Sequence, residues 1–110
     1  MSYEEAEKAI FIGIEAVKNA KDNNYDIIGV GEMGVGNTTT SSAVLSVLSG
    51  IEVEKVVGRG AGLTDAALIK KIEVVKKAID INNPNIHDAI DVVSKVGGFD
   101  IAAMAGVFLG

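Results

Sequence analysis

The sequence contains no cysteine, only one histidine and only one proline among its 110 residues. Without cysteine the chain can have neither a disulfide framework nor a thiolate metal site. His87 is the only imidazole, so a histidine-based metal site is not expected, and we expect no metal and no other cofactor. Aromatic residues make up only 5% of the chain, so its core must be built from Ile, Val, Leu and Ala.

The chain also lacks an excess of positive charge and a long apolar run. Asp and Glu outnumber Lys and Arg by 15 to 10, giving a net charge of −5, which makes nucleic acid an unsuitable partner. No uncharged apolar stretch reaches 18 residues, so no membrane span is expected. The acidic residues 1–5 do not resemble a signal peptide. These features together predict a cytoplasmic protein.

What is present is a pattern of helices with one short strand. Ser2 and Glu5 form a capping box that opens a first helix. Residues 25–30 are a short apolar run typical of a buried parallel strand, whereas residues 51–57 fit either a strand or a helical turn. Three polar residues mark the starts of further helices: Thr38, Thr64 and Asp88.

These elements predict an α/β fold that is mainly helical, with one or two short strands. A lone strand leaves its backbone donors and acceptors unpaired. We therefore expect residues 1–110 to be a single-domain fragment of a larger parallel-sheet domain. The almost wholly apolar residues 99–108 predict self-association, because such a segment is too apolar to face water.

The loop of residues 31–40 carries the clearest functional signal. It reads Gly-Glu-Met-Gly-Val-Gly-Asn-Thr-Thr-Thr and lies between the expected strand and a helix. Glycines let backbone amides approach an anion, and the start of a helix adds a positive dipole end. The loop therefore suits a phosphate group.

Four interpretations of this loop remain open from the residues alone. A dinucleotide fingerprint would use Gly29, Gly31 and Gly34, but three residues then separate the last glycine from the helix. A triphosphate loop would place Asn37 where a lysine is needed. A cradle for one phosphate would use the amides of residues 34–38 and nearby threonine hydroxyls. The fourth interpretation is a tight turn that only caps the next helix.

Charged residues outside the loop also have alternative roles. Glu32 would repel an anion, so its carboxylate is expected to accept from a sugar hydroxyl or another polar group. Lys71 flanks the apolar stripe of its helix, where a long stem can lie along the core and reach a pocket. Lys70 and Lys77 point to the opposite face, toward solvent. Arg59 could pair with phosphate or with a neighbouring carboxylate.

Three stretches of the sequence resemble one enzyme family in the right order. Residues 31–39 are similar to the GEMGIGNTT signature of nicotinate-nucleotide–dimethylbenzimidazole phosphoribosyltransferases. Residues 57–63 resemble that family's VGRGTGL, with Ala61 in place of threonine. Residues 88–106 resemble its segment ending in KVGGFEIAAMAG, with Asp100 in place of glutamate and Ala89 in place of proline.

This resemblance implies a fold, a reaction and a set of contacts. The family's enzymes are homodimers with a Rossmann-like parallel sheet and a smaller helical domain. They transfer phosphoribose from nicotinate mononucleotide to 5,6-dimethylbenzimidazole, giving α-ribazole 5′-phosphate and nicotinate for cobalamin biosynthesis. The positions implied to contact the phosphoribosyl group are Glu32, Gly34, Gly36, Asn37, Thr38, Gly60 and Lys71.

The resemblance covers only the middle of that enzyme. The family's N-terminal segment helps to form the benzimidazole pocket, and its catalytic glutamate lies near the C-terminus, so no catalytic residue is assigned here. We therefore expect a fragment that binds phosphate and ribose but is inactive by itself. The alternative is a non-enzymatic phosphate- or nucleotide-binding module, or a subunit that needs a complementary chain.

Overall fold

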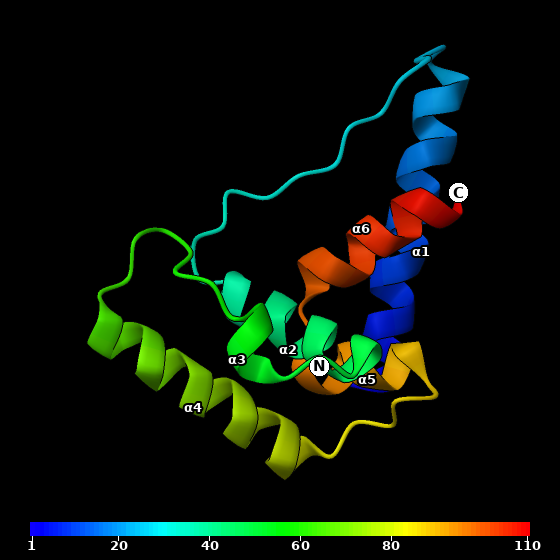
Figure 1. Cartoon of the computed structure of the whole chain (residues 1–110). Helices are drawn as coiled ribbons and strands as arrows, with labels where there is room; N and C mark the ends of the chain where they lie inside the picture. Colours follow the sequence, from blue (N-terminus) through cyan, green and yellow to red (C-terminus); the bar gives the residue numbers. More distant parts are fainter.

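The chain forms six α-helices joined by loops (Figure 1). The structure is a computed structural model that describes residues 1–110. The helices are α1 (Tyr3–Asp22), α2 (Thr38–Ser49), α3 (Val53–Val56), α4 (Asp65–Asn82), α5 (Ala89–Val96) and α6 (Phe99–Leu109). The mainly helical character predicted from the sequence is therefore confirmed.

The expected parallel sheet is wrong, because the chain forms no strand. Residues 25–30 are exposed throughout, and Ile27 keeps 89% of its surface accessible. A strand is stable only when a neighbouring strand pairs with its backbone. The one other candidate, residues 51–57, forms the short helix α3 instead. The apolar run thus lacks a partner, and the Rossmann-like architecture is absent from this chain.

Three of the six helix starts carry the side-chain caps that the sequence predicts. The capping box is present, with the Glu5 amide donating to Ser2 Oγ and the Ser2 amide donating to Glu5 Oε2. Thr64 accepts from the Ala67 amide at the start of α4, and Asp88 accepts from two amides at the start of α5. These helix starts are confirmed, since each capping side chain satisfies an otherwise unpaired donor of the first turn.

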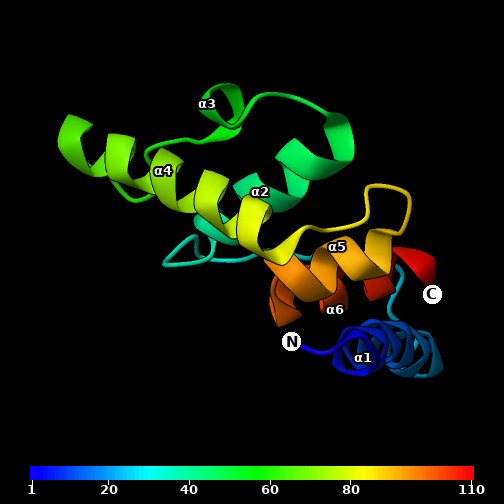
Figure 2. The same ribbon diagram turned by 90° about the horizontal axis from the view of Figure 1, so that it is seen from below.

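The helices pack in successive layers (Figures 1 and 2). α1 and α6 cross and pack against each other on one side of the molecule, α3 and α4 lie on the other, and α2 and α5 lie between them. The ten residues of the buried core are all valine or alanine, whereas the isoleucine and leucine also expected there are at most partly buried. Val75 of α4 and Val92 of α5 are its largest fully buried side chains.

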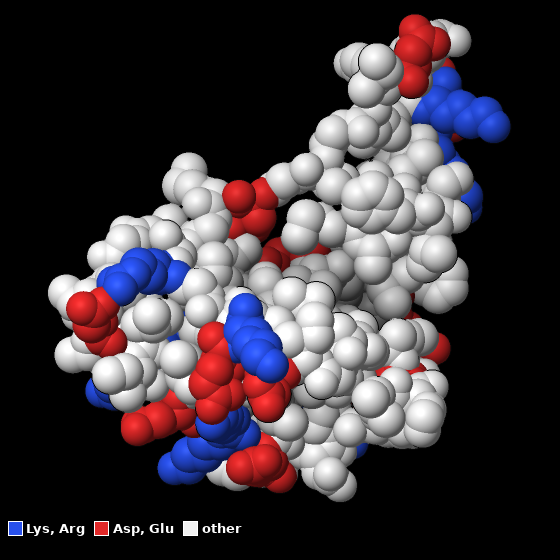
Figure 3. Space-filling model, in the orientation of Figure 1, with Lys and Arg blue, Asp and Glu red and all other residues white.

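A long connection brings the start of α2 to the α4 side of the molecule. Residues 23–37 contain no helix and run from the far end of α1 to Thr38 (Figure 1). Charged side chains gather over α3 and α4 and at the end of α1, whereas much of the surface between them is uncharged (Figure 3). None of the six helices combines the length and the apolar character needed to cross a membrane.

Candidate anion-binding site

The first turn of α2 presents backbone donors that no other group occupies. The amides of Thr38, Thr39 and Thr40 have no hydrogen-bond partner, and the helix has no side-chain cap. Its first turn also contains no acidic residue. Unpaired amides and the positive end of a helix dipole favour a negatively charged ligand at this point.

Lys71 brings a buried positive charge to the same place. Its side chain comes from α4 and only 8% of the residue is exposed. Nζ donates to Thr38 Oγ1 at 2.7 Å and to the carbonyl oxygen of Gly58 at 3.1 Å. All five ion pairs of the chain use other cations, so no carboxylate balances this ammonium.

A buried charge without a counter-ion is costly, because it has lost water and gained only neutral acceptors. The two oxygen atoms bound by Lys71 carry partial charges, not a full negative charge. The sequence-based placement of Lys71 beside the apolar stripe is confirmed, since the stem is buried. Lys70 and Lys77 are exposed, also as expected.

The segment before α4 closes around Thr38. Gly60 has φ +55°, in the left-handed region that favours glycine. A Cβ atom at Gly60 would lie 2.9 Å from Thr38 Oγ1 and 3.7 Å from Lys71 Nζ. The structure thus brings together three of the predicted site residues, which lie in three separate segments of the chain. A side chain at position 60 would occupy the space beside the ammonium.

Asn37 and the loop glycines lie next to this cluster. Asn37 Nδ2 donates to Asp100 Oδ2 of α6 at 2.9 Å, and Asn37 Oδ1 is buried without a partner. Gly34 and Gly36 both have positive φ, +80° and +85°. A Cβ at Gly34 would lie 3.8 Å from Thr38 Cγ2, whereas Gly36 has nothing within 4 Å. Gly36 is therefore required by its backbone conformation, not by close packing.

Glu32 makes no hydrogen bond to Thr38, Gly60 or Lys71. Its side chain is exposed, and its Oε2 atom accepts from the backbone amide of Gly34. That amide was one of the donors expected for a phosphate. In the free chain the Glu32 carboxylate is therefore hydrogen-bonded to one of the backbone amides of the loop.

The alternatives left open for Arg59 are settled by its pairing. Arg59 binds Asp65 and donates to the carbonyl oxygen of Leu63 at 2.8 Å, so it is held away from the α2 cluster. His87 is exposed near the start of α5. Sequence reasoning missed the role of Asp100 as the partner of Asn37. The two residues are 63 positions apart, and no local spacing links them.

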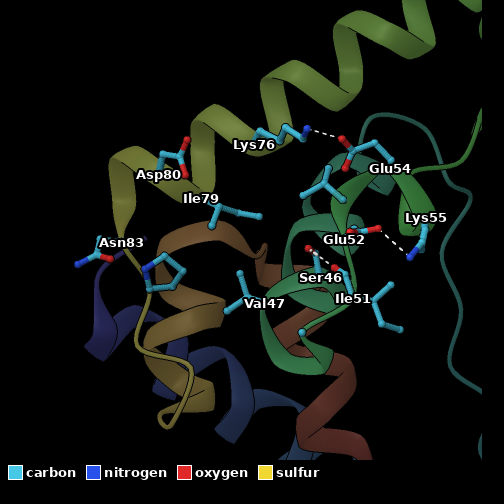
Figure 4. Close-up of a pocket in the computed structure, with 13 residues that line it drawn as sticks. Ser46, Val47, Ile51, Glu52, Glu54, Lys55, Lys76, Ile79, Asp80 and Asn83 are labelled. Atoms are coloured by element: carbon cyan, nitrogen blue, oxygen red, sulfur yellow. Dashed lines mark hydrogen bonds and ion pairs between the residues drawn. The ribbon is translucent and has the colours of Figure 1, made fainter.

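A larger cavity lies elsewhere and suits a different chemistry. It has a volume of about 890 Å³ and is lined by the C-terminal end of α2, by α3 and by the C-terminal half of α4 (Figure 4). Its rim carries Glu52, Glu54 and Asp80. Because the C-terminal end of a helix is negative and the rim is acidic, an anion is disfavoured there.

Both lysines of this rim are already paired. Lys76 binds Glu54, and the hydrogen bond lowers the pKa of the Glu54 carboxyl and raises the pKa of the Lys76 ammonium. Lys55 lies 2.7 Å from Glu52 Oε2. These exposed pairs contribute little to stability individually. None of the predicted site residues lines this cavity, so the α2 cluster remains the candidate site.

Comparison with known proteins identifies the family of the chain. A family model described as "Phosphoribosyltransferase" matches residues 1–110. The chain is 61% identical over its whole length to the nicotinate-nucleotide–dimethylbenzimidazole phosphoribosyltransferases of Clostridium acetobutylicum and Ruminiclostridium cellulolyticum. It is 50% identical over 109 residues to the protein of the same name from Alkaliphilus metalliredigens. The chain spans only 31% of the length of each of these relatives.

Proposed function

Since the chain belongs to the phosphoribosyltransferase family, we propose that it forms the phosphoribosyl-binding part of an enzyme acting on nicotinate mononucleotide. In that reaction phosphoribose passes to 5,6-dimethylbenzimidazole, giving α-ribazole 5′-phosphate and nicotinate in cobalamin biosynthesis. Residues 1–110 would be one part of the larger domain of that enzyme. The proposal includes a cytoplasmic location, which fractionation of cells producing the tagged chain would test.

The observation that carries this proposal is the unbalanced ammonium of Lys71 beside the open first turn of α2. A phosphate dianion placed there would accept from the amides of residues 38–40 and from Lys71 Nζ. Thr38 Oγ1 accepts from Lys71 and still has its own proton to donate. Charge-assisted bonds of this kind are shorter and stronger than neutral ones. The ligand would supply the negative charge that the site lacks.

Fixing the phosphate would contribute to catalysis by positioning the ribose. In the transfer, a benzimidazole nitrogen forms a bond to the anomeric carbon while the bond from that carbon to the nicotinate nitrogen breaks. The bonding electrons leave with nicotinate, and positive charge develops on the ribose in between. Positioning and electrostatic stabilisation lower such a barrier. Glu32 would accept from a ribose hydroxyl once it leaves the Gly34 amide.

The chain by itself would bind without turnover, since no residue is assigned as the base that removes the N–H proton from the other benzimidazole nitrogen. Titration with nicotinate mononucleotide and with inorganic phosphate, followed by amide chemical shifts in NMR, tests the binding. Lys71→Ala should weaken both ligands by about 1–2 kcal/mol, roughly five- to thirty-fold. Lys70→Ala removes an exposed charge from the next position and should leave affinity within about two-fold.

Failure would take a clear form. The loop only caps a helix if neither ligand changes the amide chemical shifts of residues 34–40. The same conclusion follows if Lys71→Ala and Lys70→Ala have equal affinities for the two ligands. A response that needs magnesium and a triphosphate would instead support the alternative of a nucleotide-binding module. Formation of α-ribazole 5′-phosphate by the isolated chain would contradict the proposed division between binding and chemistry.

We also propose that this chain works together with a second copy or a complementary chain. Phe99, Phe108 and Leu109 of α6 are 56%, 79% and 71% exposed. An apolar groove of about 410 Å³ lies between α2 and α6, lined mainly by Val44, Leu45, Leu48 and Ile101. Exposed apolar area of this kind is typical of association surfaces. Light scattering at micromolar concentration should give a mass above that of a monomer.

A further inference from the structure

The start of α2 differs from the other helix starts that carry a capping residue. Ser2, Thr64 and Asp88 have extended backbones, and each side chain accepts from an amide of its own first turn. Asn37 is an equally good capping residue type. Its backbone is instead helical, with φ −98° and ψ −11°, and its side chain makes no cap.

The side chain of Asn37 is held by Asp100. Nδ2 donates to Asp100 Oδ2 at 2.9 Å, a bond that links the first turns of α2 and α6. An ionised carboxylate can only accept, so the Asn37 amide must turn its nitrogen toward Asp100. Gly98 makes room for this carboxylate, because a Cβ atom there would lie 2.3 Å from Asp100 Oδ1.

The groups left unpaired by this arrangement would satisfy one another in a capped helix. Asn37 Oδ1 is a buried acceptor without a donor, and the amides of Thr39 and Thr40 are donors without an acceptor. An N-cap would join the oxygen to one of these amides. In the conformation that binds Asp100, Asn37 thus leaves these amides without a cap.

We propose that Asp100 is a positioning residue that holds Asn37 out of its capping conformation and so keeps the first-turn amides of α2 open for the phosphate. The inference rests on the proposed function, because it concerns the same site. Asp100 itself contacts no ligand and acts only through Asn37. The buried Lys71 ammonium, which extends from α4 to Thr38, independently indicates that an anion binds at the same point.

The direction in which Asp100→Ala changes phosphate affinity distinguishes this role from a simple charge effect. Removing a carboxylate near an anion site should strengthen anion binding, because a like charge disappears. If Asp100 instead restrains Asn37, Asp100→Ala frees the side chain to cap α2, and the cap competes with the ligand for its amides. We expect Asp100→Ala to weaken inorganic phosphate binding about five-fold, the scale of one N-cap.

The experiment measures inorganic phosphate affinity by NMR titration for a set of matched variants. Asp100→Asn keeps an acceptor for Asn37 and should bind within two-fold of the parent or more tightly. Asp80→Ala, which removes an exposed unpaired carboxylate of α4, controls for net charge. In the Asn37→Ala background no cap can form, so adding Asp100→Ala should cause no further loss of affinity.

A second readout needs no ligand. In Asp100→Ala the amides of Thr39 and Thr40 should exchange with solvent more slowly than in the parent, because Asn37 then binds one of them. Unchanged amide exchange in Asp100→Ala, or phosphate binding as tight as in the parent or tighter, overturns the role of Asp100. The role is also overturned if Asp100→Ala still lowers phosphate affinity in the Asn37→Ala background. Absence of phosphate binding by the parent refutes the proposed function instead, and the exchange measurement still decides the role of Asp100.

Discussion

The crossing of α1 and α6 depends on two glycines, so Gly106→Ala should destabilise the chain. A Cβ atom at Gly106 would lie 2.0 Å from the carbonyl oxygen of Ile10 and 3.0 Å from the Cα of Gly13. Both neighbours are backbone, so neither can turn aside as a flexible side chain would. The two helices would have to separate by about 1 Å or more to restore ordinary contact.

Two opposing effects decide the size of the change. Alanine favours a helix interior over glycine by about 1 kcal/mol. Overpacking a closely packed contact costs about 1–3 kcal/mol, and a clash with backbone on both sides belongs at the upper end or beyond. We therefore expect a net loss of about 2 kcal/mol. For a chain of this size that corresponds to a fall in Tm of roughly 8 °C.

Thermal melts followed by circular dichroism would measure this change. Ala16→Gly, at an exposed position of α1, isolates the helix-propensity term and should cost about 1 kcal/mol. Gly13→Ala meets Ala103 O at 2.0 Å and should resemble Gly106→Ala. The double variant should lose less than the sum, because one separation of the helices accommodates both methyl groups. A Gly106→Ala variant as stable as the parent would refute the close crossing.

Two further substitutions test the charges of the loop and of α5. Glu32→Gln should raise the affinity for inorganic phosphate about two- to five-fold, because a weaker acceptor then competes for the Gly34 amide; a lower affinity in NMR titration would contradict this. The pKa of the Asp91 carboxyl is lowered, first by the backbone amide of Asn85 and then by Lys95. Its stabilisation is present above the ordinary value of 3.8 and is lost as pH falls through the lower folded pKa. Asp91→Asn should accordingly flatten the acid side of a plot of Tm against pH, and an unchanged slope would count against this pairing.

The sequence predicted the features that depend on neighbours along the chain. Capping at Ser2, Thr64 and Asp88 is determined by residues two or three positions away, so each helix start could be recognised locally. The burial of Lys71 followed from its place relative to an apolar stripe. In both cases the residues of one helix and its cap contained the necessary information.

Features that depend on distant partners were not predictable in the same way. Residues 25–30 have the composition of a strand, but composition cannot supply the second strand that would pair with it. The bond between Asn37 and Asp100 joins two helix starts that meet only after α2, α5 and α6 have packed together. Whether Arg59 pairs with phosphate or with Asp65 depends on the geometry of its loop, which the sequence alone does not give.

The site is assembled from α2, α4 and the loop that precedes α4. Lys71 provides both hydrogen bonds that connect α4 to Thr38 and to Gly58. A phosphate bound there would contact α2 and α4 together but would make no contact with α1. Binding to the folded state alone adds RT ln(1 + [L]/Kd) to stability, about 2.7 kcal/mol at a hundred-fold excess over Kd. Because the added contacts join α2 to α4, we expect amides at that junction to gain protection against hydrogen exchange. Amides at the α1–α6 crossing should gain less, because the glycines already keep that crossing closely packed.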